Sequence, residues 1–141
     1  MSEIQLQSIG ATFLRISLGV VLLAHSLYLK LMVFTLPGTA EFFVSIGLPG
    51  LLAYVTFFVE VAVGIALIAG YQVRIAALIV IPFLLGATWA HASNGWLFSN
   101  ANGGWEYPLF LVCAAIAQVF IGGGYGAWAD AVKKRVNGLA S

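Results

Sequence analysis

The sequence predicts an all-α fold: an integral membrane four-helix bundle with a structured loop before the fourth helix. Hydrophobic residues make up 62% of the 141 residues, and charged residues only 8%. A soluble domain usually carries about 25% charged residues, because its surface faces water. So few charges cannot cover a soluble surface, and we therefore expect the apolar surface to face a lipid bilayer.

Four apolar stretches are long enough to be considered as membrane-spanning helices. A helix that crosses the hydrocarbon core needs about 20 mainly apolar residues. The four stretches cover approximately residues 9–33, 51–69, 75–92 and 107–121. Every long segment is either one of these or a short connection, which predicts a single transmembrane domain over residues 1–141 and no soluble domain.

The connections between the four stretches differ in composition. Residues 35–50 contain two Pro-Gly pairs and an amphipathic middle, which predicts a short interfacial helix around residues 40–46. Residues 70–74, with the sequence GYQVR, predict a tight turn. Residues 93–108 are rich in Asn and Gly, which favour a structured loop over a helix.

The basic residues predict the orientation in the membrane, since cytoplasmic loops carry an excess of Lys and Arg. Arg15, Arg74 and residues 133–135 fall on one side of the predicted topology, and Lys30 falls on the other. Both termini are therefore predicted to be cytoplasmic. Lys30 is interpreted most simply as a residue that snorkels to the outer interface.

Net charge and cysteine content exclude further classes of function. A formal net charge of +1 favours neither sign, which argues against a nucleic-acid partner. The chain has one cysteine, Cys113, and a lone cysteine excludes an internal disulfide and a C-x-x-C redox pair.

Two charged residues fall in the cytoplasmic half of the predicted spans. A helix rise of ~1.5 Å per residue places Arg15 of the first span and Glu60 of the second at similar depths in the cytoplasmic half. Each is followed four residues later, on the same helix face, by a glycine, Gly19 or Gly64. Because small residues let membrane helices approach closely, we predict that Gly19 and Gly64 lie on helix-packing faces and that Arg15 and Glu60 form an ion pair between the first two helices. The pair either fixes the helix register, since unpaired charges in lipid are costly, or contacts a proton or a quinone carbonyl.

A second layer of polar residues is predicted near the outer surface. His25 and His91 lie near the outer ends of the first and third spans, and Asn102, Trp105 and Glu106 precede or open the fourth. Imidazole titrates near neutral pH, so these five residues are candidates for a proton-coupled or quinone-binding pocket. The alternative is that they cap helix ends and meet interfacial water. No pair has the i, i+4 spacing of helical metal ligands, and no metal site is predicted.

Three longer stretches carry a resemblance to a known family. They are FLRISLGVVLLAHSLYLK in the first span, FFVEVAVGIALIAGYQVRIAAL across the second and third, and HASNGWLFSNANGGWEYPLFLV leading into the fourth. In their order and spacing, these stretches resemble the DoxX family of small bacterial membrane proteins. The resemblance implies a four-helix bundle in the bacterial plasma membrane. Ser26 stands where the family often has a glycine.

The resemblance also implies a function: a membrane subunit of a quinone-linked redox or oxidative-stress assembly, non-catalytic by itself. Its partners would be the lipid bilayer and soluble or membrane redox proteins, and glycine and alanine on several helices permit a homo-oligomer. Quinone is the expected cofactor, and no covalent one is expected. The alternative is a membrane scaffold or assembly factor without bound quinone. A transporter subunit is a third possibility, which the apolar stretch between the two polar layers disfavours.

Overall fold

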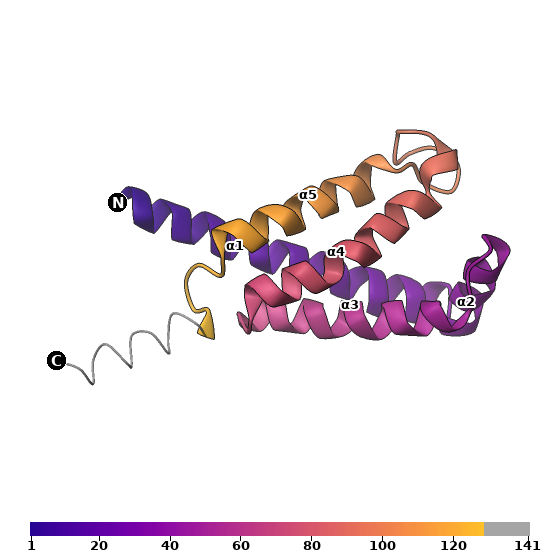
Figure 1. Cartoon of the computed structure of the whole chain (residues 1–141), viewed down its shortest axis with the longest axis horizontal. Coiled ribbons are helices and arrows are strands. Elements are labelled where there is room, and N and C mark those ends of the chain that lie inside the picture. The colour runs from indigo at the N-terminus through magenta and orange to yellow at the C-terminus, as the bar shows by residue number, and fades with distance from the viewer. Residues whose placement is uncertain (129–141) are drawn as a thin grey trace.

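The structure, a computed structural model, describes residues 1–128, and all its regular elements there are helices (Figure 1). The five α-helices are α1 (Glu3–Leu23), α2 (Leu36–Ser45), α3 (Leu51–Ala69), α4 (Val73–Ala90) and α5 (Glu106–Ile121). A π-helix, η1 (Ala24–Val33), continues α1, and a short 3-10 helix, η2 (Ala92–Asn94), follows α4. The prediction of an all-α fold is confirmed for the described part of the chain.

The first helix begins earlier than predicted and widens halfway. It begins at Glu3 because Ser2 and Gln5 form a capping box, in which each side chain bonds the other residue's backbone N–H. From Ala24 it continues as a π-helix, whose last i to i+5 hydrogen bond runs from the Phe34 N–H to the Leu29 carbonyl at 2.8 Å. Long π-helical stretches are rare, and π-bulges occur frequently at functional sites.

The other helices begin and end close to the predicted segments. α3 occupies residues 51–69, and α4 and α5 differ from their predicted segments by no more than two residues. The interfacial helix, α2, starts earlier than predicted, because the Thr35 hydroxyl accepts a hydrogen bond from the Gly38 N–H at 3.2 Å and caps it. Gly70, in the left-handed region at φ 77°, ends α3 and allows the tight turn into α4.

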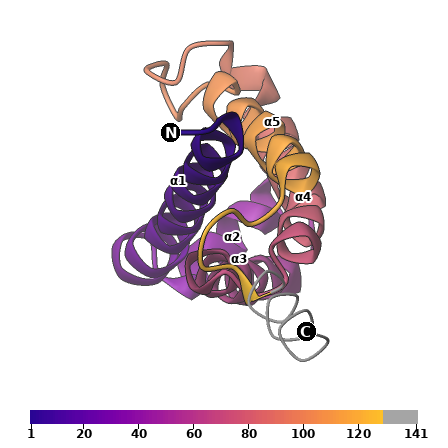
Figure 2. The ribbon, with the colours of Figure 1, turned by 90° about the vertical axis from the view of Figure 1, so that its left-hand side faces the viewer.

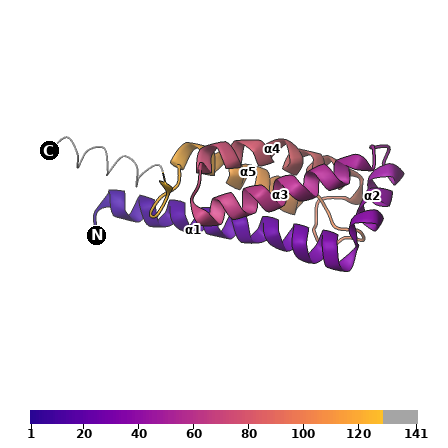
Figure 3. The same cartoon turned by 90° about the horizontal axis from the view of Figure 1, so that it is seen from below.

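The helices form an elongated body with two distinct ends. α1 packs against α3, α3 against α4, α4 against α5, and α5 against α1 (Figure 2). The terminal end holds the N-terminus, the α3–α4 turn and residues 122–128, whereas the loop end holds α2 and residues 91–105 (Figures 1 and 3). Towards the loop end, α4 and α5 diverge from α1 and α3 in the view of Figure 1.

The apolar residues are distributed as in a membrane protein. A small core runs between the helices, formed by Leu18, Leu22, Val63, Leu67, Val73, Ala76, Val80, Leu84, Leu111, Val112, Ala115 and Ala127. Many large apolar side chains point outward, such as Phe58, Phe110 and Phe120, which are 64%, 66% and 74% exposed. Three helical stretches are long and apolar enough to cross a membrane: Glu3–Val33, Leu51–Ala69 and Val73–Ala90. The chain is therefore a membrane protein, and α5, at 16 residues, is a shorter apolar helix.

Two glycines set the contact between α1 and α3. A Cβ atom added to Gly19 would lie 2.8 Å from the Gly64 carbonyl oxygen, and one added to Gly64 would lie 3.1 Å from the Gly19 carbonyl oxygen. The two helix backbones therefore touch at these positions, which leaves no room for a side chain. This is the close approach expected of small residues in a membrane.

Candidate functional site

Glu60 pairs with Lys30 and not with Arg15, so the predicted Arg15–Glu60 ion pair is wrong. Lys30 Nζ forms a salt bridge with Glu60 Oε2. The hydroxyl of Ser26, which is fully buried, donates to the same oxygen at 2.6 Å. Both partners come from η1, while Glu60 lies on α3. We call these three residues the η1–α3 polar cluster.

The direction of the helices explains why Arg15 is too far away. α1 and α3 are antiparallel and cross at Gly19 and Gly64. Arg15 lies one turn from the crossing towards the terminal end, whereas Glu60 lies one turn from it towards the loop end. Eight residues of helix rise, about 12 Å, therefore separate the two charges. Lys30, which was interpreted as a snorkelling residue, is the side chain that reaches Glu60.

Arg15 instead anchors the segment that follows α5. It is 4% exposed, and its Nη2 donates to the Tyr125 carbonyl at 3.0 Å. A Cβ atom added to Gly70 would overlap its Nη1, so the guanidinium packs against the C-terminal end of α3. The carbonyls at a helix C-terminus carry partial negative charge, which stabilises a cation there. Within residues 1–128, Arg15 thus has one hydrogen-bond partner, the Tyr125 carbonyl, and no carboxylate partner, and its buried Nε and Nη1 make no hydrogen bond there.

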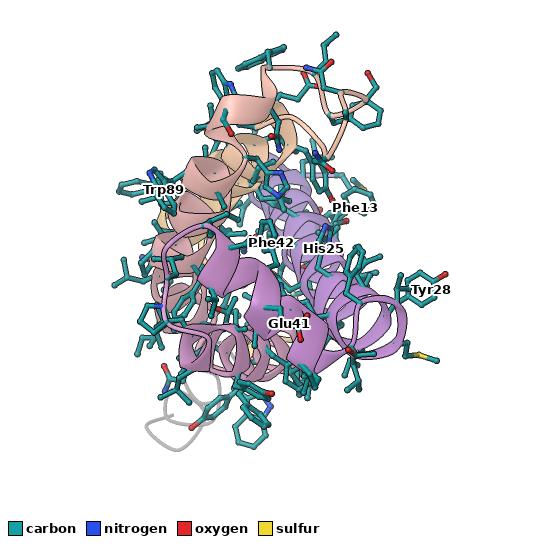
Figure 4. All side chains as sticks on the ribbon, turned by 90° about the vertical axis from the view of Figure 1, so that its right-hand side faces the viewer. Phe13, His25, Tyr28, Glu41, Phe42 and Trp89 are labelled. Carbon is teal, nitrogen blue, oxygen red and sulfur yellow. The ribbon has the colours of Figure 1, made fainter. Side chains whose placement is uncertain are left out.

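His25 lies between the first helix and α5 at the loop end. Its ring stacks on Tyr107 with the centroids 5.8 Å apart and the planes at 24°. Its Nδ1 is 3.0 Å from the Val21 carbonyl oxygen. In Figure 4, which views the loop end, His25 lies nearer the middle of the molecule, while Tyr28 and Trp89 point outward on opposite sides.

His91 and Asn102 meet inside the loop that precedes α5. His91 Nδ1 is 3.1 Å from the carbonyl oxygens of both Asn102 and Gly103. The Asn94 amide also donates to the Gly103 carbonyl, at 2.9 Å. His91 therefore connects the end of α4 to the opposite side of the loop.

Trp105 and Glu106 complete the loop. The ring of Trp105 packs edge-to-face on Trp96 with centroids 4.5 Å apart, and Glu106 Oε1 accepts from the Phe98 N–H at 2.9 Å. Gly104 is buried against the loop backbone, and a Cβ atom there would overlap the Leu97 carbonyl oxygen. The loop is thus built by specific backbone and side-chain contacts, as its composition predicts.

Replacing Gly104 with alanine should therefore disorder the loop while leaving the helices in place, because the added methyl group collides with fixed backbone. Limited proteolysis should show cleavage between residues 93 and 105 at least about tenfold faster than in the wild type, since local opening of even 1.4 kcal/mol changes a population tenfold. Ala101→Ser, at an exposed position of the same loop, is the control. Unchanged protection of Gly104→Ala would contradict this role.

The structure divides the five predicted pocket residues into two groups. His25 stacks on Tyr107, whereas the other four belong to the loop: His91, Asn102, Trp105 and Glu106. An open depression of about 430 Å³ lies on the outer side of α5 beside them. Its lining consists of Trp96, Phe98, Glu106, Tyr107, Leu109, Phe110 and Cys113. Tyr107 links the groups, because it lines the depression and stacks on His25.

The part of the chain described by the structure, residues 1–128, contains no group of three or more His, Cys, Asp or Glu side chains placed to hold a metal ion. The polar groups near the loop end are instead suited to hydrogen bonding. They include two imidazoles, one carboxylate–ammonium pair and a tyrosine. Sequence reasoning placed Lys30 at the outer end of the first span but did not select Ser26, Lys30 or Tyr107 as site residues. The i, i+4 spacing of Ser26 and Lys30 was the signal that could have identified two of them.

Comparisons with known proteins confirm the family resemblance of the sequence. The sequence profile of the DoxX family matches residues 10–93, which include η1, α3, α4 and both histidines. A protein of Bacillus subtilis (strain 168) named "Putative oxidoreductase CatD" is 34% identical over 109 residues, covering 77% of this chain and 78% of that protein. No solved structure matches the chain.

Proposed function

Because this chain belongs to the DoxX family, we propose that it is a membrane subunit of a quinone-linked redox or oxidative-stress assembly, without catalytic activity of its own. The similarity to a protein named as an oxidoreductase supports the redox role. With one cysteine in the whole chain, a thiol relay within this subunit is excluded. The electrons would therefore pass between a quinone and redox proteins that bind this subunit.

We propose that the protein lies in the bacterial plasma membrane as a four-helix bundle with both termini in the cytoplasm. α5 would be the fourth span, and its packing along α4 supports this assignment. Aromatic pairs at both ends suit the two membrane interfaces: Trp96–Trp105 at the loop end and Tyr71–Trp128 at the terminal end. Residues 133–135, the proposed cytoplasmic anchor, lie outside the described residues. A homo-oligomer is compatible with this arrangement.

The observation that carries the quinone proposal is the stacking of His25 on Tyr107 at the loop end. Ligand sites in membrane bundles lie between helices, where a few polar groups meet an apolar lining. His25 supplies a hydrogen-bonding group on η1, and Tyr107 supplies a ring on α5 that also lines the open depression. A lipid-soluble quinone could reach this place sideways from the bilayer. His91, Asn102, Trp105 and Glu106 would close it from the outside.

Quinone that copurifies with the protein tests this function. We expect wild-type protein purified with its native lipid to retain quinone. The His25→Ala variant should retain at least about fivefold less quinone, because it loses one hydrogen bond and one aromatic contact with the ligand. Extracted lipid is assayed by liquid chromatography. Trp89→Leu is the control, because Trp89 is an aromatic residue at the same end that points outward (Figure 4).

The alternative function is a scaffold or assembly factor without bound quinone. The use of His91, Asn102 and Glu106 in bonds within the loop favours it, because those groups then serve the loop's structure. Wild-type protein that contains no quinone, in a preparation that retains native lipid, would support the scaffold. Equal amounts of copurified quinone in the wild type and the His25→Ala variant would contradict the proposed place of binding.

A further inference from the structure

We propose that the loop-end site prefers a quinol, which donates hydrogen bonds, to the oxidised quinone, which only accepts them. The inference rests on the proposed function and names the redox state that the site binds best. It follows from the tautomer that the structure assigns to His25.

The tautomer of His25 is fixed by its own helix. Its Nδ1 lies 3.0 Å from the Val21 carbonyl oxygen, and a carbonyl oxygen can only accept. Nδ1 therefore carries the proton of the neutral ring, and Nε2 carries the lone pair. No described residue bonds Nε2, and it is not among the fully buried side-chain atoms that lack a partner. The exposed nitrogen of neutral His25 is thus a hydrogen-bond acceptor.

The charged residues of the η1–α3 polar cluster do not change the role of His25 Nε2 as an acceptor. Glu60 is an acceptor when ionised, and Lys30, the charged donor on the same helix as His25, is engaged by the Glu60 carboxylate. The second histidine lies within the loop, where its Nδ1 is 3.1 Å from the carbonyl oxygens of Asn102 and Gly103 and 3.4 Å from the Asn94 amide nitrogen, which can donate to it. His25 is therefore the imidazole whose tautomer is fixed by its backbone contact.

Ligand chemistry then decides the preference. A quinol carries two hydroxyl groups, and one of them can donate to Nε2 of His25 while its ring packs beside Tyr107. An oxidised quinone has two carbonyl oxygens and no hydroxyl group, so it leaves the Nε2 lone pair without a donor. One hydrogen bond contributes about 1 kcal/mol, which corresponds to about a fivefold difference in affinity.

The test compares both redox states of one short-chain benzoquinone. Wild-type protein in lipid nanodiscs is titrated anaerobically with the quinone or with its two-electron-reduced quinol. The ligand-dependent rise in thermal unfolding temperature gives the relative affinities. We expect the quinol to bind about fivefold more tightly at a pH where imidazole is neutral.

Two variants of His25 make the outcome specific. His25→Phe keeps an aromatic ring against Tyr107 but removes Nε2, so the quinol preference should disappear while quinone still binds. His25→Gln offers both a donor and an acceptor and should bind the two forms about equally. Equal binding by the wild type, tighter binding of quinone, or a preference that survives in both variants would overturn the inference. Binding of neither form would overturn the proposed function itself.

Discussion

Replacing Lys30 with methionine should reduce the free energy of unfolding by about 3 kcal/mol, because it leaves the carboxylate of Glu60 without its counter-ion. Glu60 is 5% exposed, and removal of one partner from a buried ion pair typically costs about 3–5 kcal/mol. A loss at the lower end of this range is expected because the Lys30 side chain remains 18% exposed. Reversible unfolding in mixed detergent micelles measures the loss.

A double-mutant cycle separates this pair from the one predicted by the sequence. Lys30→Met combined with Glu60→Gln should cost less than the sum of the single changes, by about 1–3 kcal/mol. Arg15→Gln combined with Glu60→Gln is the matched control. Its two losses should add to within about 0.5 kcal/mol, since about 12 Å of helix separates the side chains. Coupling of Glu60 to Arg15, with none to Lys30, would contradict the structure.

Alanine at Gly19 and alanine at Gly10 should change stability in opposite directions, although both positions lie on α1. The Gly19→Ala methyl group would lie 2.8 Å from both the Gly64 carbonyl oxygen and Ile68 Cγ1. The helices must then separate, at a cost of about 1–3 kcal/mol. A Cβ atom at Gly10 meets nothing within 4 Å, so Gly10→Ala should stabilise the helix by about 0.5–1 kcal/mol.

The same unfolding assay in detergent micelles checks this contrast. Because both substitutions add one methyl group to the same helix, differences in lipid solvation are small. A Gly19→Ala variant as stable as the wild type would show that α1 and α3 do not touch at this crossing. Destabilisation by Gly10→Ala would instead point to a contact that the described residues do not provide.

The helices could be predicted from sequence because their signal is local. A run of apolar residues between polar connections defines a membrane helix by length alone, and residues 51–69 became α3 without change. The start of α1 was missed because Ser2 and Gln5 are polar, yet their capping box extends the helix beyond the apolar stretch. The π-helix was also missed, since no simple residue pattern distinguishes i to i+5 from i to i+4 bonding.

The site was harder to predict because its partners depend on three-dimensional register. Depths counted from the two span ends placed Arg15 and Glu60 in one layer. The observed crossing of Gly19 with Gly64 separates the two charges instead. Because the helices are antiparallel, Arg15 and Glu60 lie on opposite sides of that crossing. The i, i+4 spacing that puts Ser26 and Lys30 on one helix face can be recognised in the sequence. Lys30 was interpreted as an interfacial residue, however, and so was not considered as a partner of Glu60. The stacking of His25 on Tyr107 requires knowledge of how α5 packs against the first helix.

The central claim is that a quinone ring lies at the loop end, between η1 and the start of α5. A photoreactive quinone analogue, activated in native membranes and followed by peptide mass spectrometry, tests it most directly. The account predicts modified residues around His25 and Tyr107, and protection when excess unlabelled quinol is present. Labelling confined to the terminal end, around Arg15 and residues 118–128, would contradict it.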